Sequence, residues 1–121
     1  IVAQRLARKN CQECLISDES ATPAALKYIG FSDAEIETMR PQRGGGCAVC
    51  EGTGYKGRQG IYEVLRVTPE VEQAILAAAQ APEILEAARK DNFLTMQEVG
   101  RDFLADGVLC LEEFSRVLVV S

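Results

Sequence analysis

Two pairs of cysteines are the residues in this sequence whose types and spacing could do chemistry. Cys11 and Cys14 form one C-x-x-C pair, and Cys47 and Cys50 form another. Two intervening residues suit a tight loop that brings both sulfurs to one ion, and four thiolates make the closed tetrahedral set of a structural zinc site, with Zn–S bonds of about 2.3 Å. We therefore predict that the four cysteines bind one zinc ion.

The residues after the second pair support this prediction. They read E-G-T-G-Y-K-G, and Gly52, Gly54 and Gly57 allow backbone conformations that other residues avoid. Their amides are uncrowded and can donate hydrogen bonds to the thiolates. A redox C-x-x-C motif needs one exposed thiol of low pKa at the start of a helix, and a glycine-rich turn fits a metal loop better.

Disulfides are the other common use of paired cysteines. The first residues, I-V-A-Q-R-L-A-R-K-N, have no signal-peptide pattern and no initiator methionine. We expect a cytoplasmic fragment of a longer chain, and in that compartment C-x-x-C pairs bind metal more often than they form disulfides. The fifth cysteine, Cys110, lies far from both pairs and is predicted to be a small buried or helix-capping residue.

Length and charge narrow the class of protein. The chain has 121 residues, enough for one domain, and no apolar run long enough to span a membrane. Its formal charge is −5, and residues 67–121 carry ten acidic and four basic side chains, which argues against DNA or RNA as a partner. Basic residues near the cysteines serve either to offset thiolate charge or to contact an acidic partner or a neighbouring subunit. They are Arg5, Arg8, Lys9, Arg40, Arg43, Lys56 and Arg58.

The elements that must position the cysteines are predicted to be mostly helical. We expect residues 1–10 to end a helix that leads from an upstream domain, residues 11–57 to form a zinc-binding lobe with a two-helix insert, and residues 58–121 to form a C-terminal helical subdomain. A strand at 58–67 is expected to pair with residues near 52–56. Start and stop signals place helices at 23–30, 33–40, 68–80, 82–91, 96–106 and 111–119. The fold class is mainly α: a small helical bundle, whose core is the last four helices, with a tetracysteine zinc-binding lobe and a short β-hairpin.

The glycine-rich stretch also resembles two nucleotide-binding motifs, and we reject both. Residues 52–57 fit G-x-G-x-x-G, but no strand precedes them, no long helix follows, and a cysteine lies two positions before. A phosphate loop requires Lys and then Ser or Thr, where this chain has Arg58 and Gln59. There is no histidine for general base chemistry. We predict no catalytic residue and no nucleotide site in this chain.

Taken together, the motifs resemble one family. Q-R-L-A-R-K-N-C-Q-E-C at residues 4–14 and G-C-A-V-C-E-G-T-G-Y-K-G-R-Q-G-I-Y-E-V-L at residues 46–65 are similar to the C-terminal region of the type II secretion and type IV pilus assembly ATPases, the GspE/PilB family. The ending G-V-L-C-L-E-E-F-S-R-V resembles the family's G-x-T-S-L-E-E-V-x-R-V. Cys110 stands where the family usually has a capping Ser or Thr.

The resemblance implies a cytoplasmic hexameric ATPase, held at the bacterial inner membrane by its partners. ATP and magnesium would bind upstream of residue 1, where the family's Walker A, Walker B, Asp-box and His-box motifs lie, so the fragment itself is expected not to be an enzyme. The implied partners are neighbouring subunits of the hexamer and inner-membrane platform or accessory proteins, without insertion of this chain into the membrane. The metal role carries over to Cys11, Cys14, Cys47 and Cys50, since all four match.

One alternative comes from a different class of protein. Residues 47–54 match C-x-x-C-x-G-x-G, the repeat of DnaJ-type cysteine-rich domains. Such a match would make the chain a zinc-dependent chaperone-like or thiol-exchange module. Those domains use several copies of the repeat, and this chain has one.

Overall fold

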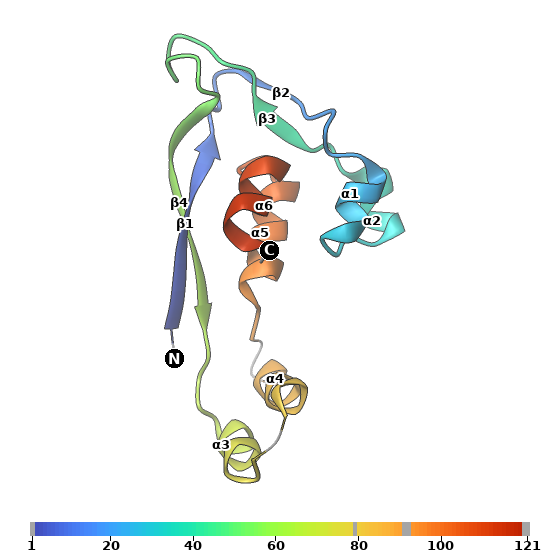
Figure 1. The fold of residues 1–121 in the computed structure, drawn as a ribbon, viewed down its shortest axis with the longest axis vertical. Helices are drawn as coiled ribbons and strands as arrows, with labels where there is room; N and C mark the ends of the chain where they lie inside the picture. Colours follow the sequence, from blue (N-terminus) through green and yellow to red (C-terminus); the bar gives the residue numbers. More distant parts are fainter. Residues whose placement is uncertain (1, 79, 91–92, 120–121) are drawn as a thin grey trace.

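The structure is a computed structural model that describes residues 2–78, 80–90 and 93–119. These residues form six helices and two small antiparallel sheets. A long β1–β4 ribbon lies beside α5 and α6, α1–α2 lie on the other side of these two helices, and α3–α4 lie at the lower end of the molecule (Figure 1). The elements are β1 Val2–Asn10, β2 Leu15–Ser17, α1 Pro23–Tyr28, α2 Asp33–Thr38, β3 Gln42–Gly44, β4 Tyr55–Val64, α3 Pro69–Leu76, α4 Ala81–Arg89, α5 Met96–Ala105 and α6 Leu111–Leu118.

The six predicted helices are confirmed, each slightly shorter than expected. At four of them a side-chain oxygen accepts a hydrogen bond from the backbone N–H three positions later, which satisfies a donor that has no partner inside the helix. These N-caps are Thr22, Ser32, Thr68 and Thr95. Ser32 and Glu35 form a reciprocal capping box. Residues 79 and 91, which the predicted helices included, lie outside the described residues.

The expectation that residues 1–10 end a helix is wrong, because Val2–Asn10 form strand β1. This strand pairs antiparallel with β4, from Val2 opposite Val64 to Asn10 opposite Tyr55. The predicted strand is confirmed as β4, but its partner is β1 instead of residues near 52–56. Cross-strand hydrogen bonds with a segment far along the chain outweigh the helix preference of the Ala, Gln, Arg and Lys residues in this stretch.

The main core lies between the inner face of the β1–β4 ribbon and helices α1, α5 and α6. Gly100 lies where α5 and α6 approach closely, and a Cβ atom there would lie 2.2 Å from Leu118 Cδ1. A larger residue would therefore push the two helices apart. The buried cluster consists of Ala7, Leu26, Phe31, Ile61, Leu104, Leu109, Leu111, Phe114 and Leu118.

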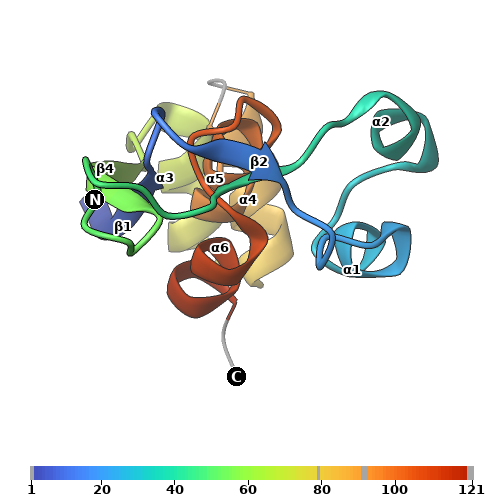
Figure 2. The same cartoon turned by 90° about the horizontal axis from the view of Figure 1, so that it is seen from above.

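The last four helices do not form one bundle, contrary to the prediction. Helices α3 and α4 pack on each other away from α1 and α2 (Figures 1 and 2), and their buried residues Val71 and Ala88 lie outside the main cluster. Helices α5 and α6 were expected to pack on α3 and α4, but they pack on the β1–β4 ribbon. The fold is rich in helices, but the ribbon organises it. None of the helices in the described residues is long and apolar enough to cross a membrane.

The outer face of the ribbon is apolar and largely exposed. The pairing register places Val2, Leu6, Tyr62 and Val64 on this face, with exposed fractions of 67%, 51%, 52% and 51%. Tyr62 folds over Gly60, where a Cβ atom would lie 2.8 Å from the Tyr62 side chain. A two-stranded ribbon with apolar side chains on both faces has one face left to cover.

Candidate metal centre

The four cysteines of the two pairs come together at one end of the β1–β4 ribbon. Cys11 follows the last residue of β1, and Cys14 precedes β2; Cys47 and Cys50 lie between β3 and β4. The four Sγ atoms all lie within 4.8 Å of one another. Among the described residues, this is the one group of three or more metal-ligating side chains close enough to hold an ion.

Three of the six distances between the sulfurs match those of a tetrahedral thiolate site. The Sγ–Sγ distance is 3.7 Å for Cys11 and Cys47, 3.8 Å for Cys14 and Cys50, and 3.7 Å for Cys47 and Cys50. A tetrahedron with Zn–S bonds of the usual length has edges of about 3.8 Å. A disulfide bond is about 2.05 Å long, and these cysteines are free thiols. The four sulfurs therefore lie close enough to bind one metal ion together.

Burial makes it unfavourable to ionise two of these thiols, Cys11 and Cys14, without a cation nearby. Burial raises the pKa of Cys11, which is fully buried, and raises the pKa of Cys14 to about 12. Burial also acts against ionisation of Cys50, but the backbone amides of Cys47 and Gly54 each donate a hydrogen bond to its Sγ at 3.2 Å. Because these bonds outweigh burial, the pKa of Cys50 falls to about 6. The protein thus stabilises one thiolate by itself, and a divalent cation would stabilise the others.

Close backbone approach of two glycines joins the cysteine loops. A Cβ atom on Gly44 would lie 2.0 Å from the Gly54 carbonyl oxygen, and one on Gly54 would lie 2.5 Å from the Gly44 oxygen. Gly54 also has a φ of +81°, which side chains disfavour. The prediction that glycine amides donate to sulfur is confirmed for Gly54, whereas the Gly52 amide donates to the Cys47 carbonyl oxygen.

Further hydrogen bonds hold the two loops in register. The Cys11 amide donates to the Gly54 carbonyl oxygen at 2.9 Å, and the Gly45 amide donates to the Cys14 carbonyl oxygen at 2.8 Å. The Gly46 amide donates to Cys14 Sγ at 3.3 Å. The backbone therefore positions the sulfurs on both sides of the site, which is the support that metal ligands require.

Asn10 attaches the site to the core, a role that sequence analysis missed. Its backbone N–H donates to the Val108 carbonyl oxygen at 2.8 Å. Its side-chain Nδ2 donates to the carbonyl oxygens of Gly107 and Gln42 at 3.0 and 3.1 Å. Asn10 is only 1% exposed. Because Cys11 is the next residue, these bonds fix the first sulfur relative to the turn between α5 and α6. A single asparagine in a basic stretch carries no sequence signal for this role.

A buried carboxylate is the second feature that sequence analysis missed. The Glu113 side chain is fully buried, and Arg8 and Arg116 both bind it, with shortest Nη2–O distances of 2.9 and 2.7 Å. Acidic side chains usually lie at the protein surface, and Glu113 does not. The pair Glu113 and Arg116 has helical i,i+3 spacing and could have been suspected; the contact with Arg8 spans most of the chain.

Cys110 is confirmed as a buried helix-capping residue. It is 4% exposed, and its Sγ accepts a hydrogen bond from the Glu113 amide at 3.4 Å at the start of α6. The Tyr55 hydroxyl lies 3.3 Å from the same sulfur. Cys110 is not part of the tetracysteine group.

The basic residues near the cysteine loops do not gather on the sulfurs. Arg8 binds Glu113, and Arg40 Nη1 donates to the Met39 carbonyl oxygen at 2.9 Å. Arg8 lies opposite Arg58 in the ribbon. None of the seven residues named from the sequence donates a hydrogen bond to a cysteine sulfur in the described part of the chain. Their charge acts on the site only at longer range.

Fold and site together define a helix-covered β-ribbon whose two cysteine loops bring four thiols within 4.8 Å of one another. Residues 1–116 match the family described as type II/IV secretion system protein. The chain belongs to this family, and the resemblance to its GspE/PilB-like ATPases is confirmed.

Curated relatives come from both kinds of machine. The chain is 41% identical over 113 residues to the type IV pilus assembly ATPase PilB of Thermus thermophilus, covering 93% of this chain and 13% of the relative. It is 38% identical over 117 residues to PilB of Pseudomonas aeruginosa, covering 97% and 20%. It is 34% identical over 123 residues to the type II secretion system protein E of Dickeya dadantii, covering 97% and 22%. The chain thus spans less than a quarter of the length of these relatives.

Proposed function

We propose that this chain is the C-terminal metal-binding and helical region of a cytoplasmic hexameric ATPase that powers type IV pilus assembly or type II protein secretion. The family membership and the names of the relatives support this assignment. ATP and magnesium would act in the upstream domain of the full-length protein. The present region would serve as a structural and interaction module and would not hydrolyse ATP by itself.

Within that region, we propose that Cys11, Cys14, Cys47 and Cys50 bind one structural zinc ion. The observation that carries this proposal is the sulfur spacing: all four Sγ atoms lie within 4.8 Å of one another, and three of the six pairs are 3.7 to 3.8 Å apart. Four protein ligands leave no open position for substrate, so the ion would cross-link the fold and not take part in chemistry. Thiolate ligands favour zinc among the abundant divalent ions.

The zinc would clamp the base of the insert that contains α1 and α2. The paired ligands Cys11 and Cys47, and likewise Cys14 and Cys50, are 36 positions apart, so one ion closes the whole insert into a loop. The four ligands are close together only in the folded lobe, so the ion would bind the folded lobe and not the unfolded chain. Metal binding energy would thereby become folding energy for this lobe.

The insert is also held at a second point, by the packing of α1 on the main core. Leu26 and Phe31 belong to the main hydrophobic cluster, and Arg101 Nη1 on α5 donates to the Ile29 carbonyl oxygen at 3.0 Å. The clamp would fix the base of the insert while this packing holds α1. Held at both points, α2 would form a rigid surface for neighbouring subunits or inner-membrane platform proteins, and the outer face of the ribbon would pack against the ATPase core of the full-length protein.

Native mass spectrometry with a chelator titration tests the zinc proposal. We expect one zinc ion per wild-type chain, loss of the ion in Cys47→Ser, and loss of circular dichroism signal as the chelator removes the metal. Cys110→Ser is the matched control, because it removes a buried cysteine outside the tetracysteine group. A wild-type chain without metal and with its cysteines oxidised in pairs would contradict the zinc proposal while leaving the family membership intact.

A chaperone-like or thiol-exchange module is the alternative function, and the C-x-x-C-x-G-x-G match of residues 47–54 favours it. Thiol exchange requires an accessible sulfur for in-line attack. Cys11 and Cys50 are 0% and 5% exposed, which makes this function the weaker proposal. A thiol-exchange assay on the zinc-loaded chain separates the two functions, because a structural site should be inactive in it.

A further inference from the structure

The four clustered cysteines differ in how readily a dissolved reagent can reach them. Cys11 and Cys50 are buried, with exposed fractions of 0% and 5%. Cys14 and Cys47 are half-buried, and both sequence neighbours of Cys47, Gly46 and Ala48, are exposed. A small reagent in water would therefore meet Cys14 and Cys47 before the other two cysteines.

The same four sulfurs also differ in the hydrogen bonds that they accept. Cys50 Sγ accepts two from backbone amides, as described above, and Cys14 Sγ accepts one from the Gly46 amide at 3.3 Å. Cys47 Sγ accepts no N–H from any residue that the structure describes, and its polar contacts are the sulfurs of Cys11 and Cys50. A hydrogen bond stabilises a thiolate and lowers its nucleophilicity, so Cys47 keeps the more nucleophilic of the two accessible sulfurs.

We propose that Cys47 is the reactive thiolate of the metal centre, the residue that soluble oxidants and alkylating reagents modify first. This inference rests on the proposed zinc site and adds a modification site to it. In the loaded site all four sulfurs are thiolates, so access and hydrogen bonding decide which of them reacts. Cys47 alone combines partial exposure with a sulfur that accepts no N–H from the described residues.

Hydrogen peroxide is the oxidant for which the first step is written. The Cys47 thiolate attacks one peroxide oxygen, the S–O bond forms as the O–O bond breaks, and the departing hydroxide takes up a proton to become water. The sulfur loses two electrons and becomes a sulfenic acid, while the peroxide is reduced.

Cys50 supplies the second sulfur. Its Sγ lies 3.7 Å from Cys47 Sγ on the same loop, so a bond between them closes without moving the two cysteine loops apart, whereas Cys11 lies on the other loop. Attack by Cys50 forms the S–S bond and breaks the S–O bond, and the second hydroxide leaves as water after taking up a proton. Two thiolates remain, too few for a closed tetrahedral site, so zinc would be released and the clamp opened.

Alkylation of the wild-type chain tests which sulfur reacts first. The chain is loaded with zinc, its metal content is checked by native mass spectrometry, and it is treated with less than one equivalent of iodoacetamide and digested with trypsin. The peptides to compare are 10–27, with Cys11 and Cys14, and 44–56, with Cys47 and Cys50. We expect fragment ions to show roughly fivefold or more label on Cys47 than on Cys14, because the free sulfur is the better nucleophile.

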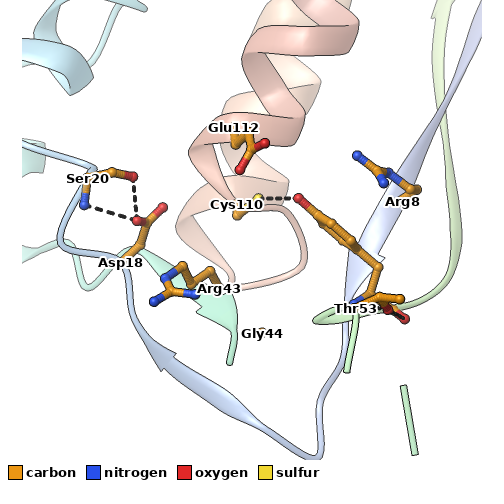
Figure 3. A pocket seen from close by; sticks show the side chains of 9 residues that line it. Arg8, Asp18, Ser20, Arg43, Gly44, Thr53, Cys110 and Glu112 are labelled. Atoms are coloured by element: carbon orange, nitrogen blue, oxygen red, sulfur yellow. Dashed lines mark hydrogen bonds between the residues drawn. The ribbon is translucent and has the colours of Figure 1, made fainter. Parts of the chain in front are cut away.

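Cys110 is the internal control in the same digest. It is a thiol outside the metal group and only 4% exposed, and its Sγ lies 3.3 Å from the Tyr55 hydroxyl in the wall of a polar pocket (Figure 3). It should carry little label, so that labelling at Cys47 reports the metal centre and not general thiol reactivity.

Hydrogen peroxide then tests the disulfide. One equivalent should release zinc to a zinc-binding dye and remove two hydrogens from the mass of peptide 44–56, and a reductant should restore metal binding. Peptides 10–27 and 44–56 joined to each other would instead overturn the assignment of Cys50 as the second sulfur.

Matched histidine variants complete the test. Cys47→His and Cys14→His each keep a zinc ligand that cannot form a sulfenic acid. We expect Cys47→His to slow peroxide-driven zinc release roughly fivefold or more, and Cys14→His to behave nearly as wild type. If a variant fails to load, the labelling of the wild-type chain decides.

Equal labelling of Cys14 and Cys47, first reaction at Cys14, or equal slowing by the two variants would each overturn the proposal. The zinc would still be bound before treatment in these cases, so the proposed zinc site would stand. A wild-type chain that binds no zinc would overturn both.

Discussion

The Glu113 carboxylate binds Arg8 at two places at once, although the two residues are 105 positions apart in the chain. Glu113 Oε2 accepts from the Arg8 backbone amide at 2.6 Å, and Oε1 accepts from Arg8 Nη2 at 2.9 Å. The Arg8 guanidinium also lies over the Tyr55 ring, 4.2 Å from its centroid. This contact ties α6 to the strand that leads into the first cysteine loop, so the C-terminal helix and the cysteine loops share one support.

Removing this charge should destabilise the whole fold. In Glu113→Gln, the amide group would present N–H donors to arginines that need an acceptor, inside a fully buried site. Breaking a buried pair from one side costs about 3 to 5 kcal/mol. We expect a loss of that order in urea denaturation of the metal-loaded chain. Glu37→Gln, on the exposed face of α2, should change stability by less than about 0.5 kcal/mol; equal losses in the two variants would contradict the role of Glu113.

Acid should remove the same stabilisation over a defined pH range. Burial acts against the charged form of Glu113, but hydrogen bonds from Arg116 and Arg8 outweigh it and lower the pKa from 4.5 to about 2. Because the folded pKa is the lower one, the stabilisation is complete above pH 4.5 and is lost as the pH falls toward 2, roughly 3 kcal/mol in total. The stability difference between wild type and Glu113→Gln should therefore shrink across this range. A constant difference would show that Glu113 does not titrate as described.

Local sequence signals predicted much of this structure. The N-cap residues marked the helix starts, because a capping side chain and its backbone donor lie within one turn of each other. The two C-x-x-C spacings likewise predicted a cysteine cluster, since each pair needs only a tight loop. Cys110 was predicted to be a small buried or helix-capping residue, and it is both.

Features that depend on distant segments could not be predicted. Strand β1 contains residues that favour helices, and its apolar Val2 and Leu6 lie on an exposed face, so its pattern gives no sign of a buried strand. Pairing with β4 decides its conformation. The contacts of Asn10 with the Gly107 region and of Arg8 with Glu113 join opposite ends of the chain in the same way. Nothing in the sequence near either residue indicates a contact with a residue so far along the chain.

Loss of one cysteine should loosen the metal lobe and leave the helical core intact. In Cys47→Ser we expect amide hydrogen exchange to accelerate at least tenfold in residues 11–17 and 42–54, because the clamp is missing. Amides of α5 and α6 should stay protected, and α1 should keep partial protection through Leu26 and Phe31. Cys110→Ser should leave the lobe unchanged. Unchanged exchange in both regions of Cys47→Ser would mean that the cysteines do not clamp the insert.

Cys110→Ser should also stabilise the start of α6. The sulfur is a weak acceptor for the Glu113 amide, and serine is a strongly preferred N-cap residue. The Tyr55 hydroxyl, 3.3 Å from the sulfur, can donate to the serine oxygen, so the buried hydroxyl would not lack a partner. We expect a gain of about 0.5 to 1 kcal/mol in thermal or urea unfolding. A loss of stability would show that the volume of the sulfur matters more than its hydrogen bond.

Gly54→Ala should damage the metal centre more than Gly52→Ala does. Gly54 and Gly52 have nearly the same positive φ, +81° and +79°. Adding a Cβ atom should therefore cost about the same backbone strain, about 1 kcal/mol, in each variant. At Gly52 the new atom would meet nothing within 4 Å, whereas at Gly54 it would lie 2.5 Å from the Gly44 carbonyl oxygen. Moving the loops apart would also pull the Gly54 amide from Cys50 Sγ.

We therefore expect Gly54→Ala to lose about 1 to 3 kcal/mol more than Gly52→Ala in unfolding free energy. Competition with a zinc-binding dye should show weaker metal retention in Gly54→Ala alone. If the two variants matched in both measurements, the contact between Gly44 and Gly54 would not set the sulfur positions, and backbone strain would be the whole effect. If Gly54→Ala lost stability but kept its metal, the contact would hold the loops together without shaping the ligand set.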